Sequence, residues 1–273
     1  MLRILVVRSS ESAHGRCVIL IGVPTESRPR EKRVAATPES IGKLRELGYE
    51  VAVERGAGTA SGIHDDAYEA AGAQLVSREE ALAAALVLKV RPPTEDEVRA
   101  LSEGATLVSL LQPERHPGLT DILASRRVSA IALERVPRIT RAQKMDVLSS
   151  MANLAGYRAV LEAAELYQGM FGPQVTAAGA APPARVLVIG AGVAGLAAIA
   201  AARALGAEVR AFDTRAAARE QVESLGASFL TIEIEESGDG GGGYAKVLLL
   251  NGFLRRFSFQ SHVSPMKGVS RGS

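Results

Sequence analysis

The stretch RVLVIGAGVAGLAAIAAARALGAEVRAFD, residues 185–213, constrains the fold more than any other part of the chain. A valine-rich apolar run leads into a G-x-G-x-x-G motif formed by Gly190, Gly192 and Gly195, and an alanine-rich segment of helical period follows at once. A second apolar run ends at Asp213, about 20 residues beyond the glycines, where a ribose-binding carboxylate is expected. The stretch therefore predicts strand, tight turn, helix and strand, the first half of a dinucleotide-binding fold.

Each residue type in this motif has a physical role in holding a dinucleotide. Gly190 permits the turn, Gly192 lets the backbone approach a pyrophosphate, and Gly195 lets the helix pack closely on the strand. The free N–H groups at the start of the helix face the phosphates. Asp213 would bind the ribose hydroxyls and repel a 2′-phosphate, which favours NAD over NADP, although Arg215 weakens this preference because an arginine can neutralise that phosphate. The alternative is a glycine-rich helix start that holds no ligand.

Composition narrows the class of protein. The 273 residues leave room for two domains, and a hydrophobic content of 47% suffices for buried cores. The longest apolar stretches are interrupted by glycines or charges, so we expect no membrane span. Basic residues are interspersed with acidic ones and the net charge is +2, which argues against a nucleic-acid partner. Cys17 is the only cysteine and the four histidines are scattered, so we expect no metal site.

From Val18 onward, apolar runs that suit strands alternate with segments of helical period, which predicts a parallel sheet covered by helices on both faces. In this part the expected strands are 18–23, 50–53, 86–90, 106–111 and 128–133. The expected helices are 38–47, 65–71, 77–85, 95–102 and 117–124. A long helix begun by a serine cap is expected from Ser149, and beyond the glycine motif we expect a helix at 217–225, a strand at 227–232 and a mobile loop at 233–243.

These patterns predict an α/β protein with two Rossmann-like or flavodoxin-like parallel-sheet domains, the second incomplete. The expected boundaries are an N-terminal extension at 1–20, an N-terminal α/β domain at 21–135, a polar loop and interdomain helix at 136–170, the first half of a dinucleotide-binding domain at 171–247, and a basic tail at 248–273. From Val247 onward the sequence has no acidic residue and loses its periodicity. We interpret this tail as a frameshifted or truncated end.

Several segments together resemble the NAD(H)-binding alpha subunit, or first domain, of proton-translocating nicotinamide nucleotide transhydrogenase. The segments are GVPTE (22–26), RVAATPE (33–39), RITRAQKMDVLSSMANLAGYRA (138–159), TAAG (176–179), PPARVLVIGAGVAGLAA (182–198), AFDTR (211–215) and GYAKV (243–247). The block at 138–159 is far more specific than the glycine motif. On composition alone, its polar loop would be a solvated connector between domains.

The resemblance implies the residues that bind nucleotide. Around the nicotinamide carboxamide and ribose it places Arg138, Asp146 and Ser149, and it directs Gln143 towards the nucleotide of a partner domain. The adenosine half would be lined by Val193, Asp213, Thr214 and Arg215. A loop with Gly243 and Tyr244 would close over the bound nucleotide and exclude water.

Alanine dehydrogenase belongs to the same superfamily and is the alternative activity. In alanine dehydrogenases a lysine and a histidine move protons on the amino acid, and the corresponding positions here hold Arg91 and Gln112. Arginine cannot act as a base near neutral pH and glutamine does not titrate. Hydride transfer between two nicotinamides needs no proton transfer in that step, so these residues favour transhydrogenation. Arg33, which resembles a carboxylate anchor of the dehydrogenases, is expected to be structural here.

The resemblance also implies the assembly. It implies NAD(H) on this chain, NADP(H) on a partner domain, a homodimer, and membrane-spanning partner subunits that couple hydride transfer to proton translocation. The expected location is cytoplasmic and peripheral to the inner membrane. The mitochondrial matrix is the less favoured alternative, and it is kept because arginines outnumber acidic residues in the first residues, as in a presequence. A third interpretation is an inactive truncated remnant.

Overall fold

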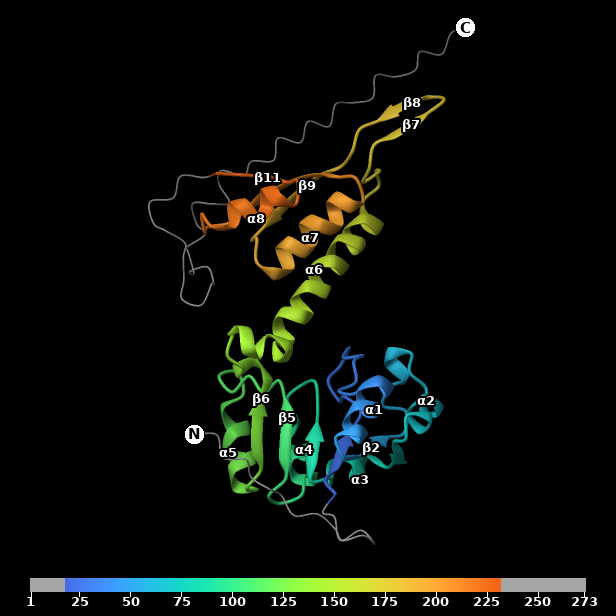
Figure 1. Cartoon of the computed structure of the whole chain (residues 1–273), viewed down its shortest axis with the longest axis vertical. Coiled ribbons are helices and arrows are strands. Elements are labelled where there is room, and N and C mark those ends of the chain that lie inside the picture. Colours follow the sequence, from blue (N-terminus) through green and yellow to red (C-terminus); the bar gives the residue numbers. More distant parts are fainter. Residues whose placement is uncertain (1–17, 232–273) are drawn as a thin grey trace. The chain divides into compact units, whose positions relative to one another are not determined.

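The computed structural model describes residues 18–231, which form two compact units divided between Leu148 and Ser149 (Figure 1). The expectations for residues 1–17 and 232–273, including Gly243, Tyr244 and the basic tail, lie outside the described residues. The predicted domain boundaries remain predictions. Among residues 18–231, no helix has the length and apolar character that crossing a bilayer would require.

The first unit contains a six-stranded sheet in which all neighbouring strands are parallel, as the alternating pattern predicts. Its order is β3-β2-β1-β4-β5-β6, so the direction of strand addition reverses between β1 and β4. The strands are β1 (Leu20–Val23), β2 (Glu50–Glu54), β3 (Gln74–Val76), β4 (Leu86–Leu88), β5 (Thr106–Ser109) and β6 (Ser129–Ala132). In open α/β sheets, ligands bind beyond the carboxyl ends of the strands at such a reversal.

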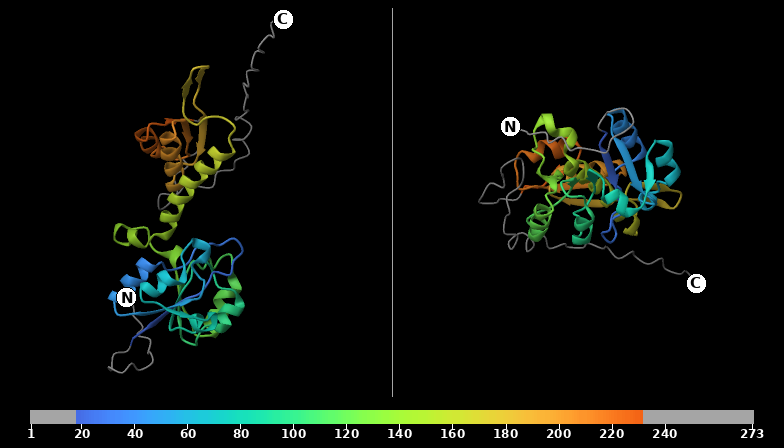
Figure 2. Two further views of the ribbon diagram at one scale, coloured as in Figure 1. Left: turned by 90° about the vertical axis from the view of Figure 1, so that its right-hand side faces the viewer. Right: turned by 90° about the horizontal axis from the view of Figure 1, so that it is seen from below.

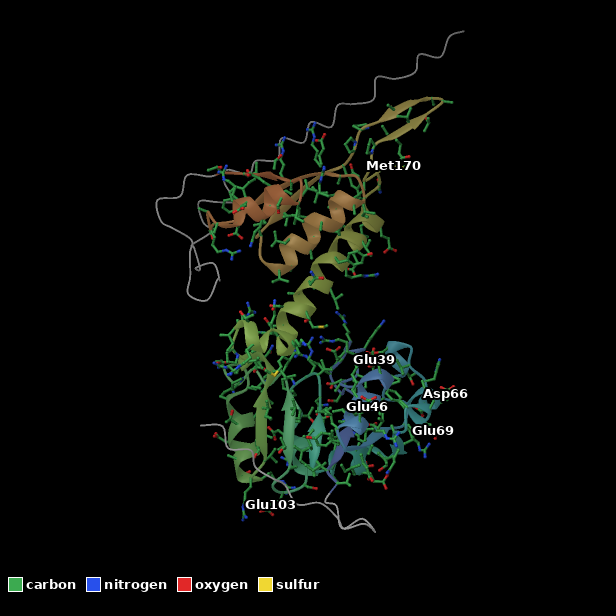
Figure 3. All side chains as sticks on the ribbon, in the orientation of Figure 1. Glu39, Glu46, Asp66, Glu69, Glu103 and Met170 are labelled. Atoms are coloured by element: carbon green, nitrogen blue, oxygen red, sulfur yellow. The ribbon has the colours of Figure 1, made fainter. Side chains whose placement is uncertain are left out.

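Helices connect these strands, and three of them begin with reciprocal capping boxes. The side chains of Thr37, Ser77 and Thr94 each accept a hydrogen bond from the backbone N–H of the residue three positions later. The side chain of that later residue accepts a hydrogen bond from the backbone N–H of the capping residue. The helices are α1 (Pro38–Glu46), α2 (Asp65–Ala70), α3 (Arg78–Leu82), α4 (Glu95–Ala100) and α5 (Pro117–Ser125), with short 3₁₀ turns η1 (Thr59–Ser61), η2 (Leu133–Arg135) and η3 (Thr140–Met145). The acidic side chains of α1 and α2 that Figure 3 labels, Glu39, Glu46, Asp66 and Glu69, are all exposed.

The second unit contains α6 (Val147–Leu166), most of which lies beyond the division, and a three-stranded parallel sheet in the order β11-β10-β9. Its elements after α6 are β7 (Gln174–Thr176), β8 (Gly179–Ala181), β9 (Arg185–Ile189), α7 (Val193–Ala204), β10 (Glu208–Phe212), α8 (Ala218–Ser224) and β11 (Ser228–Phe229). The β7–β8 hairpin is antiparallel and exposed throughout, and it extends away from the three-stranded sheet of its own unit (Figure 2).

The expected strands and helices of residues 18–231 are all present, with ends that shift by up to three residues, and three details differ. The strand β3 and the β7–β8 hairpin were not expected, because neither lies within an apolar run long enough to show alternation. The serine cap at Ser149 is wrong. The helix α6 begins at Val147, directly after the turn that ends at Met145 and Asp146, so Ser149 lies within its first turn.

Each unit has its own hydrophobic core. In the first unit, one cluster around Ile21, Val53 and Tyr68 packs at β1 and β2, and a second cluster around Val87 and Leu107 packs at β4 and β5. In the second unit, a third cluster packs α7 and α8 on the three-stranded sheet, with Ile199, Val209 and Val222 among its members. The cavity and the glycine turn described next lie at the ends of these two sheets.

Candidate nucleotide-binding site

The glycine motif forms the turn between β9 and α7, and each glycine meets a different constraint. Gly190 has a φ of 94°, a left-handed conformation, and its N–H donates to the carbonyl oxygen of Phe212 at 2.7 Å. Gly192 is the N-cap of α7, and a Cβ there would meet nothing within 4 Å. At Gly195 a Cβ would overlap the backbone carbonyl oxygen of Gly190. Gly195 is therefore required by packing, whereas Gly192 leaves open space in front of the helix.

The carboxylate of Asp213 lies directly against this turn. Asp213 follows β10 and is buried, and its Oδ2 accepts a hydrogen bond from the N–H of Ala191 at 2.7 Å. Arg215 donates to Oδ1 from both its backbone N–H, at 2.8 Å, and Nε, at 3.0 Å, and to Oδ2 from its guanidinium, at 3.0 Å. Burial by itself raises the pKa of Asp213, but the hydrogen bonds from Arg215 and Ala191 outweigh burial and hold the pKa below its usual value.

Two further residues of the expected adenosine half lie at the same edge of the sheet. Thr214 follows Asp213, and its Oγ1 is buried without a hydrogen-bond partner among the described residues. Buried hydroxyls normally have a partner, so this oxygen is suited to a ligand or an ordered water. Val193 is the first residue of α7 and is 40% exposed beside the open space at Gly192. The structure thus gathers Gly190, Val193 and Asp213 with their neighbours around one turn.

The residues expected around the nicotinamide lie on the chain just before and within the start of α6. The Nε of Arg138 is 3.8 Å from Oδ2 of Asp146, so the structure brings these two side chains together. Gln143 is exposed on η3, between Ile139 and Met145, which are 53% and 55% exposed. Ser149 lies in the first turn of α6. Arg138, Gln143 and Asp146 belong to the first unit, and Ser149 and the glycine motif belong to the second.

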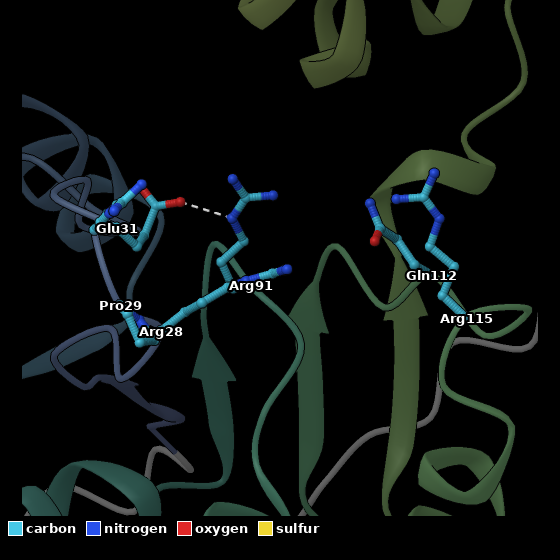
Figure 4. A pocket seen from close by; sticks show the side chains of 7 residues that line it. Arg28, Pro29, Glu31, Arg91, Gln112 and Arg115 are labelled. Carbon is cyan, nitrogen blue, oxygen red and sulfur yellow. Dashed lines mark hydrogen bonds and ion pairs between the residues drawn. The ribbon is translucent and has the colours of Figure 1, made fainter.

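A cavity of about 240 Å³ lies in the first unit, at the carboxyl ends of β1, β4 and β5 (Figure 4). Arg91 and Gln112, the two positions at which the sequence resemblance expects a lysine and a histidine in alanine dehydrogenases, line it together. Arg33 does not line it: both oxygens of Glu31 accept hydrogen bonds from the Arg33 guanidinium, at 2.7 and 2.6 Å. The lining residues are Arg28, Pro29, Arg30, Glu31, Arg91, Gln112 and Arg115.

Sequence reasoning missed Arg28, Arg30 and Arg115 as neighbours of Arg91. The available signal was their position, since each follows shortly after the strand-like runs that end near Val23 and Ser109. Carboxyl ends of parallel strands meet at one edge of a sheet, so basic residues after separate strands can converge there. Within residues 18–231, no group of three or more His, Cys, Asp and Glu side chains is arranged to hold a metal ion.

A buried ionic network, also missed, supports this edge. The side chain of Lys89 is fully buried, and its Nζ lies 3.0 Å from Oε1 of Glu97 and 3.6 Å from Oε2 of Glu26. Glu26 accepts hydrogen bonds from the backbone N–H groups of Val90, at 2.6 Å, and Arg91, at 3.2 Å. The network thereby holds the backbone that carries Arg91 into the cavity.

Comparison with known protein families gives two matches that run almost end to end along the described chain. The N-terminal domain model of alanine dehydrogenase/PNT matches residues 22–155, and the C-terminal domain model of the same family matches residues 159–258. The chain belongs to the alanine dehydrogenase/PNT family. The two family models meet at residues 155–159, within α6, and the structure divides near the start of the same helix, between Leu148 and Ser149.

Relatives within this family include transhydrogenase subunits. The chain is 50% identical over 230 residues to the NAD(P) transhydrogenase subunit alpha of Haemophilus influenzae, covering 84% of the chain and 45% of that protein. It is 50% identical over 229 residues to the NAD(P) transhydrogenase subunit alpha of Cereibacter sphaeroides, covering 82% of the chain and 44% of that protein. The chain thus spans somewhat less than half the length of these two relatives.

Solved structures of the family include both kinds of enzyme. The crystal structure of transhydrogenase from Sinorhizobium meliloti matches with a TM-score of 0.76 and 48% identity, over 78% of this chain and 64% of that one. An L-alanine dehydrogenase structure matches with a TM-score of 0.67 and 31% identity, over 77% of this chain and 60% of that one. Both likenesses confirm the predicted α/β fold with parallel sheets.

Proposed function

We propose that this chain is the NAD(H)-binding component of a proton-translocating NAD(P) transhydrogenase and that it takes part in hydride transfer between NADH and NADP+. The observation that carries the proposal is the pair Arg91 and Gln112 in the cavity of the first unit. By the sequence resemblance, an alanine dehydrogenase would have groups that move protons at these two positions. Neither side chain can do that work at neutral pH. The 50% identity to transhydrogenase alpha subunits supports the same choice.

NAD(H) rather than NADP(H) is the proposed nucleotide of this chain. Asp213 lies ionised at the end of β10, where a 2′-phosphate would meet its charge. Arg215, the residue that could favour a 2′-phosphate, makes a close ion pair with that same carboxylate. The pyrophosphate would lie in the open space before Gly192, facing the N–H groups of α7.

The nicotinamide end is proposed to involve the Arg138 to Ser149 segment. Arg138 carries donors and Asp146 carries acceptors, so the pair can bind both the oxygen and the nitrogen of a carboxamide. Gln143, exposed beside Ile139 and Met145, is proposed to reach the nucleotide of an NADP(H)-binding partner domain. An exposed polar residue flanked by two exposed apolar ones has the composition of a contact surface.

The proposed assembly follows from the same family relationship. The chain would act as a homodimer on the cytoplasmic side of the inner membrane, docked on NADP(H)-binding and membrane-spanning subunits that couple hydride transfer to proton translocation. Gly243 and Tyr244 would close over bound nucleotide.

The test is a fluorescence titration of the purified chain with NADH and, separately, with NADPH. Saturation by NADH at micromolar concentration, with NADPH at least about tenfold weaker, is the expected result. Saturation by neither nucleotide in a folded sample would contradict the proposal and favour an inactive remnant. Hydride exchange between NADH and an NADP analogue should then appear only when an NADP(H)-binding transhydrogenase domain is added.

The second candidate is an alanine dehydrogenase-like oxidoreductase, favoured by 36% identity over 200 residues to the alanine dehydrogenase of Mycolicibacterium smegmatis. NAD+ reduction by alanine in the absence of any partner domain would establish it. The variant Asp146→Asn tests the proposed nicotinamide site, because loss of this carboxylate should weaken NADH binding. As a matched control, Asp121→Asn removes the same charge from the exposed surface of α5 and should leave NADH binding unchanged.

A further inference from the structure

The strand β6 forms one edge of the six-stranded sheet in the first unit (Figure 1). It pairs with β5, and among residues 18–231 no further strand lies beside it. The N–H of Ser129 points towards β5, since it donates to the carbonyl oxygen of Ala105 at 2.9 Å. The backbone groups of successive residues in a strand point to opposite sides, so the N–H and C=O of Ala130 face the outer edge. The outer side of β6 therefore presents backbone donors and acceptors to which another strand can pair.

The sequence of β6 contains nothing that would prevent such pairing. Natural edge strands usually carry a charged residue, a proline or a bulge, which keeps other strands from adding to them. The strand β6 reads SAIA, and its register with β5 runs without interruption from Ser129 to Ala132, so it has none of these features. Its first three residues are exposed, and Ile131 is 50% exposed. An uncharged, exposed and unbulged edge is suited to a further strand.

A row of apolar side chains crosses the sheet towards the same edge. In the strand register Leu88 neighbours Val108, and Val108 neighbours Ile131, so the three side chains share one face. Exposure rises along the row, because Leu88 packs against a hydrophobic cluster, Val108 is half-buried and Ile131 is exposed. Helix α5 packs on the opposite face, with Leu107 and Ala132. An apolar residue placed beside Ile131 by a further strand would extend the row and cover its exposed end.

The first residues of the chain supply a sequence that matches this edge. Residues 2–7 read LRILVV, and valine and isoleucine are enriched in strands. In an extended conformation Leu2, Ile4 and Val6 would share one face, which is wholly apolar, and Arg3 would lie on the other. The apolar face has the character that the row ending at Ile131 requires.

The length of chain between this segment and β1 is sufficient to reach β6. Residues 8–17, which read RSSESAHGRC, separate the segment from Val18 at the amino edge of the sheet. Four strand spacings of about 4.8 Å, or about 19 Å, separate β1 from a position beyond β6. Ten extended residues span up to about 33 Å. The shortest path brings residue 7 to the amino edge first, so residues 2–7 would run antiparallel to β6.

We propose that residues 2–7 add to the free edge of β6 as an antiparallel seventh strand, with Ile4 beside Ile131 and Leu5 beside Ala130. An antiparallel edge strand on an otherwise parallel sheet is a common arrangement. The added strand satisfies the outward backbone groups of Ala130 and continues the apolar row on the face opposite α5. It also closes the edge to pairing with a second copy of the chain.

The first test is amide hydrogen exchange of the full chain, measured residue by residue by NMR. The N–H of Ala130 should exchange at least about tenfold more slowly in the unmodified chain than in the variant Leu5→Pro, because proline cannot donate to the Ala130 carbonyl oxygen and disrupts the added strand. The control Ser12→Pro changes the linker and should leave the exchange rate of Ala130 unchanged. Equal exchange in the unmodified chain and in Leu5→Pro would overturn the proposal. Slow exchange in both would assign the edge to a second copy or to residues 245–250, and fast exchange in both would leave it open.

The second test checks the register by disulfide formation in a chain that carries Cys17→Ser, since Cys17 is the only cysteine. The pair Ile4→Cys and Ile131→Cys should form a disulfide within one chain under mild oxidation, because directly opposite residues have Cβ atoms about 4.5–5.5 Å apart. The matched control, Leu5→Cys with Ile131→Cys, places its two thiols on opposite faces of the sheet and should cross-link at least about tenfold more slowly. Equal cross-linking of the two pairs, or disulfides found only between two chains, would refute the proposed strand.

Discussion

At the scale of single residues, Asp213 links the glycine turn to the strand beside it. Its carboxylate accepts from Ala191 in the turn and from Arg215 in the loop after β10. A buried carboxylate is stable only when its oxygens are paired, and here both are. The residue therefore holds the turn in shape as well as carrying the charge that is proposed to select NAD(H).

We expect the variant Asp213→Asn to lower the free energy of unfolding of the second unit. The amide cannot accept all the hydrogen bonds that the carboxylate accepts, and it leaves the partly buried Arg215 without its counterion. The expected loss is about 1–3 kcal/mol. It is measured by urea denaturation. The exposed pair of Arg219 and Glu223 supplies the control, because Glu223→Gln should change the unfolding free energy by less than about 0.5 kcal/mol.

The lowered pKa of Glu31 leads to a prediction about how stability depends on pH. Hydrogen bonds from Arg33 lower its pKa to about 2 from 4.5, with help from Arg91 and against the opposing effect of burial. Its contribution to stability is therefore fully present above pH 4.5 and is lost as the pH falls towards 2. Because both arginines are about one third exposed, we expect a contribution of about 1–2 kcal/mol rather than the full value of the shift.

The measurement is the unfolding free energy between pH 6 and pH 3, the acid range in which Glu31 begins to titrate in the unfolded chain. The variant Glu31→Gln should be less stable at pH 6 and should show a shallower decline on acidification. A decline as steep as that of the unmodified protein would contradict the assignment. Glu103→Gln, at an exposed pair with Arg127, is the control and should leave the pH profile unchanged.

At the scale of elements, two close approaches shape the second unit. A Cβ at Gly195 would overlap the Gly190 carbonyl oxygen, and a Cβ at Gly156 in α6 would overlap the carbonyl oxygen of Ala194 in α7. Glycine is therefore the residue that allows α7 to pack tightly on the turn before it and on α6 beside it. The helix α7, which is proposed to face the pyrophosphate, is positioned by contacts that leave no room for a side chain.

Within the glycine motif, we expect Gly195 to matter for stability and Gly192 to matter for nucleotide binding. Gly195→Ala should destabilise the second unit by about 1–3 kcal/mol or more, because the new methyl group meets backbone that cannot move freely. Gly192→Ala should leave stability nearly unchanged, since its Cβ meets open space, yet it should weaken NADH binding by occupying the proposed path of the pyrophosphate.

For both variants, stability is measured by thermal unfolding and NADH affinity by titration. An equal loss of stability in the two variants would contradict the packing difference. Unchanged NADH affinity in a folded Gly192→Ala variant would place the pyrophosphate elsewhere.

At the scale of the whole molecule, the chain has separate cores in its two units. Each unit has its own parallel sheet and its own candidate site, and a unit with its own core is expected to unfold cooperatively. The cavity of the first unit and the glycine turn of the second can therefore be perturbed one at a time.

We expect Ile199→Ala to destabilise the second unit alone. Ile199 is fully buried between α7 and its sheet, and removing its side chain should lower the unfolding free energy by about 2–5 kcal/mol. In calorimetry one transition should shift while another stays in place. Val87→Ala, from the core of the first unit, should produce the opposite pattern. A single transition that both variants shift equally would show that the units unfold together.

Much of the fold follows from local sequence signals. Capping residues such as Thr37 and Ser77 lie directly before their helices, and apolar runs such as 185–189 match their strands residue for residue. The helix start at Ser149 was wrong because the preceding turn could not be distinguished from a loop. The strands β3, β7 and β8 were missed because none lies within an apolar run long enough to show alternation, whereas the equally short β4 lies within the longer run 86–90.

The sequence by itself determined the α/β class, the glycine turn and the position of Asp213, because these depend on residues close together in the chain. Only the tertiary structure decided that Arg28, Arg91 and Arg115 share one cavity. The physical reason is that parallel strands bring their carboxyl ends to one edge whatever their separation in sequence. Periodicity reports which face of an element is buried, whereas the convergence of charges at a sheet edge depends on strand order.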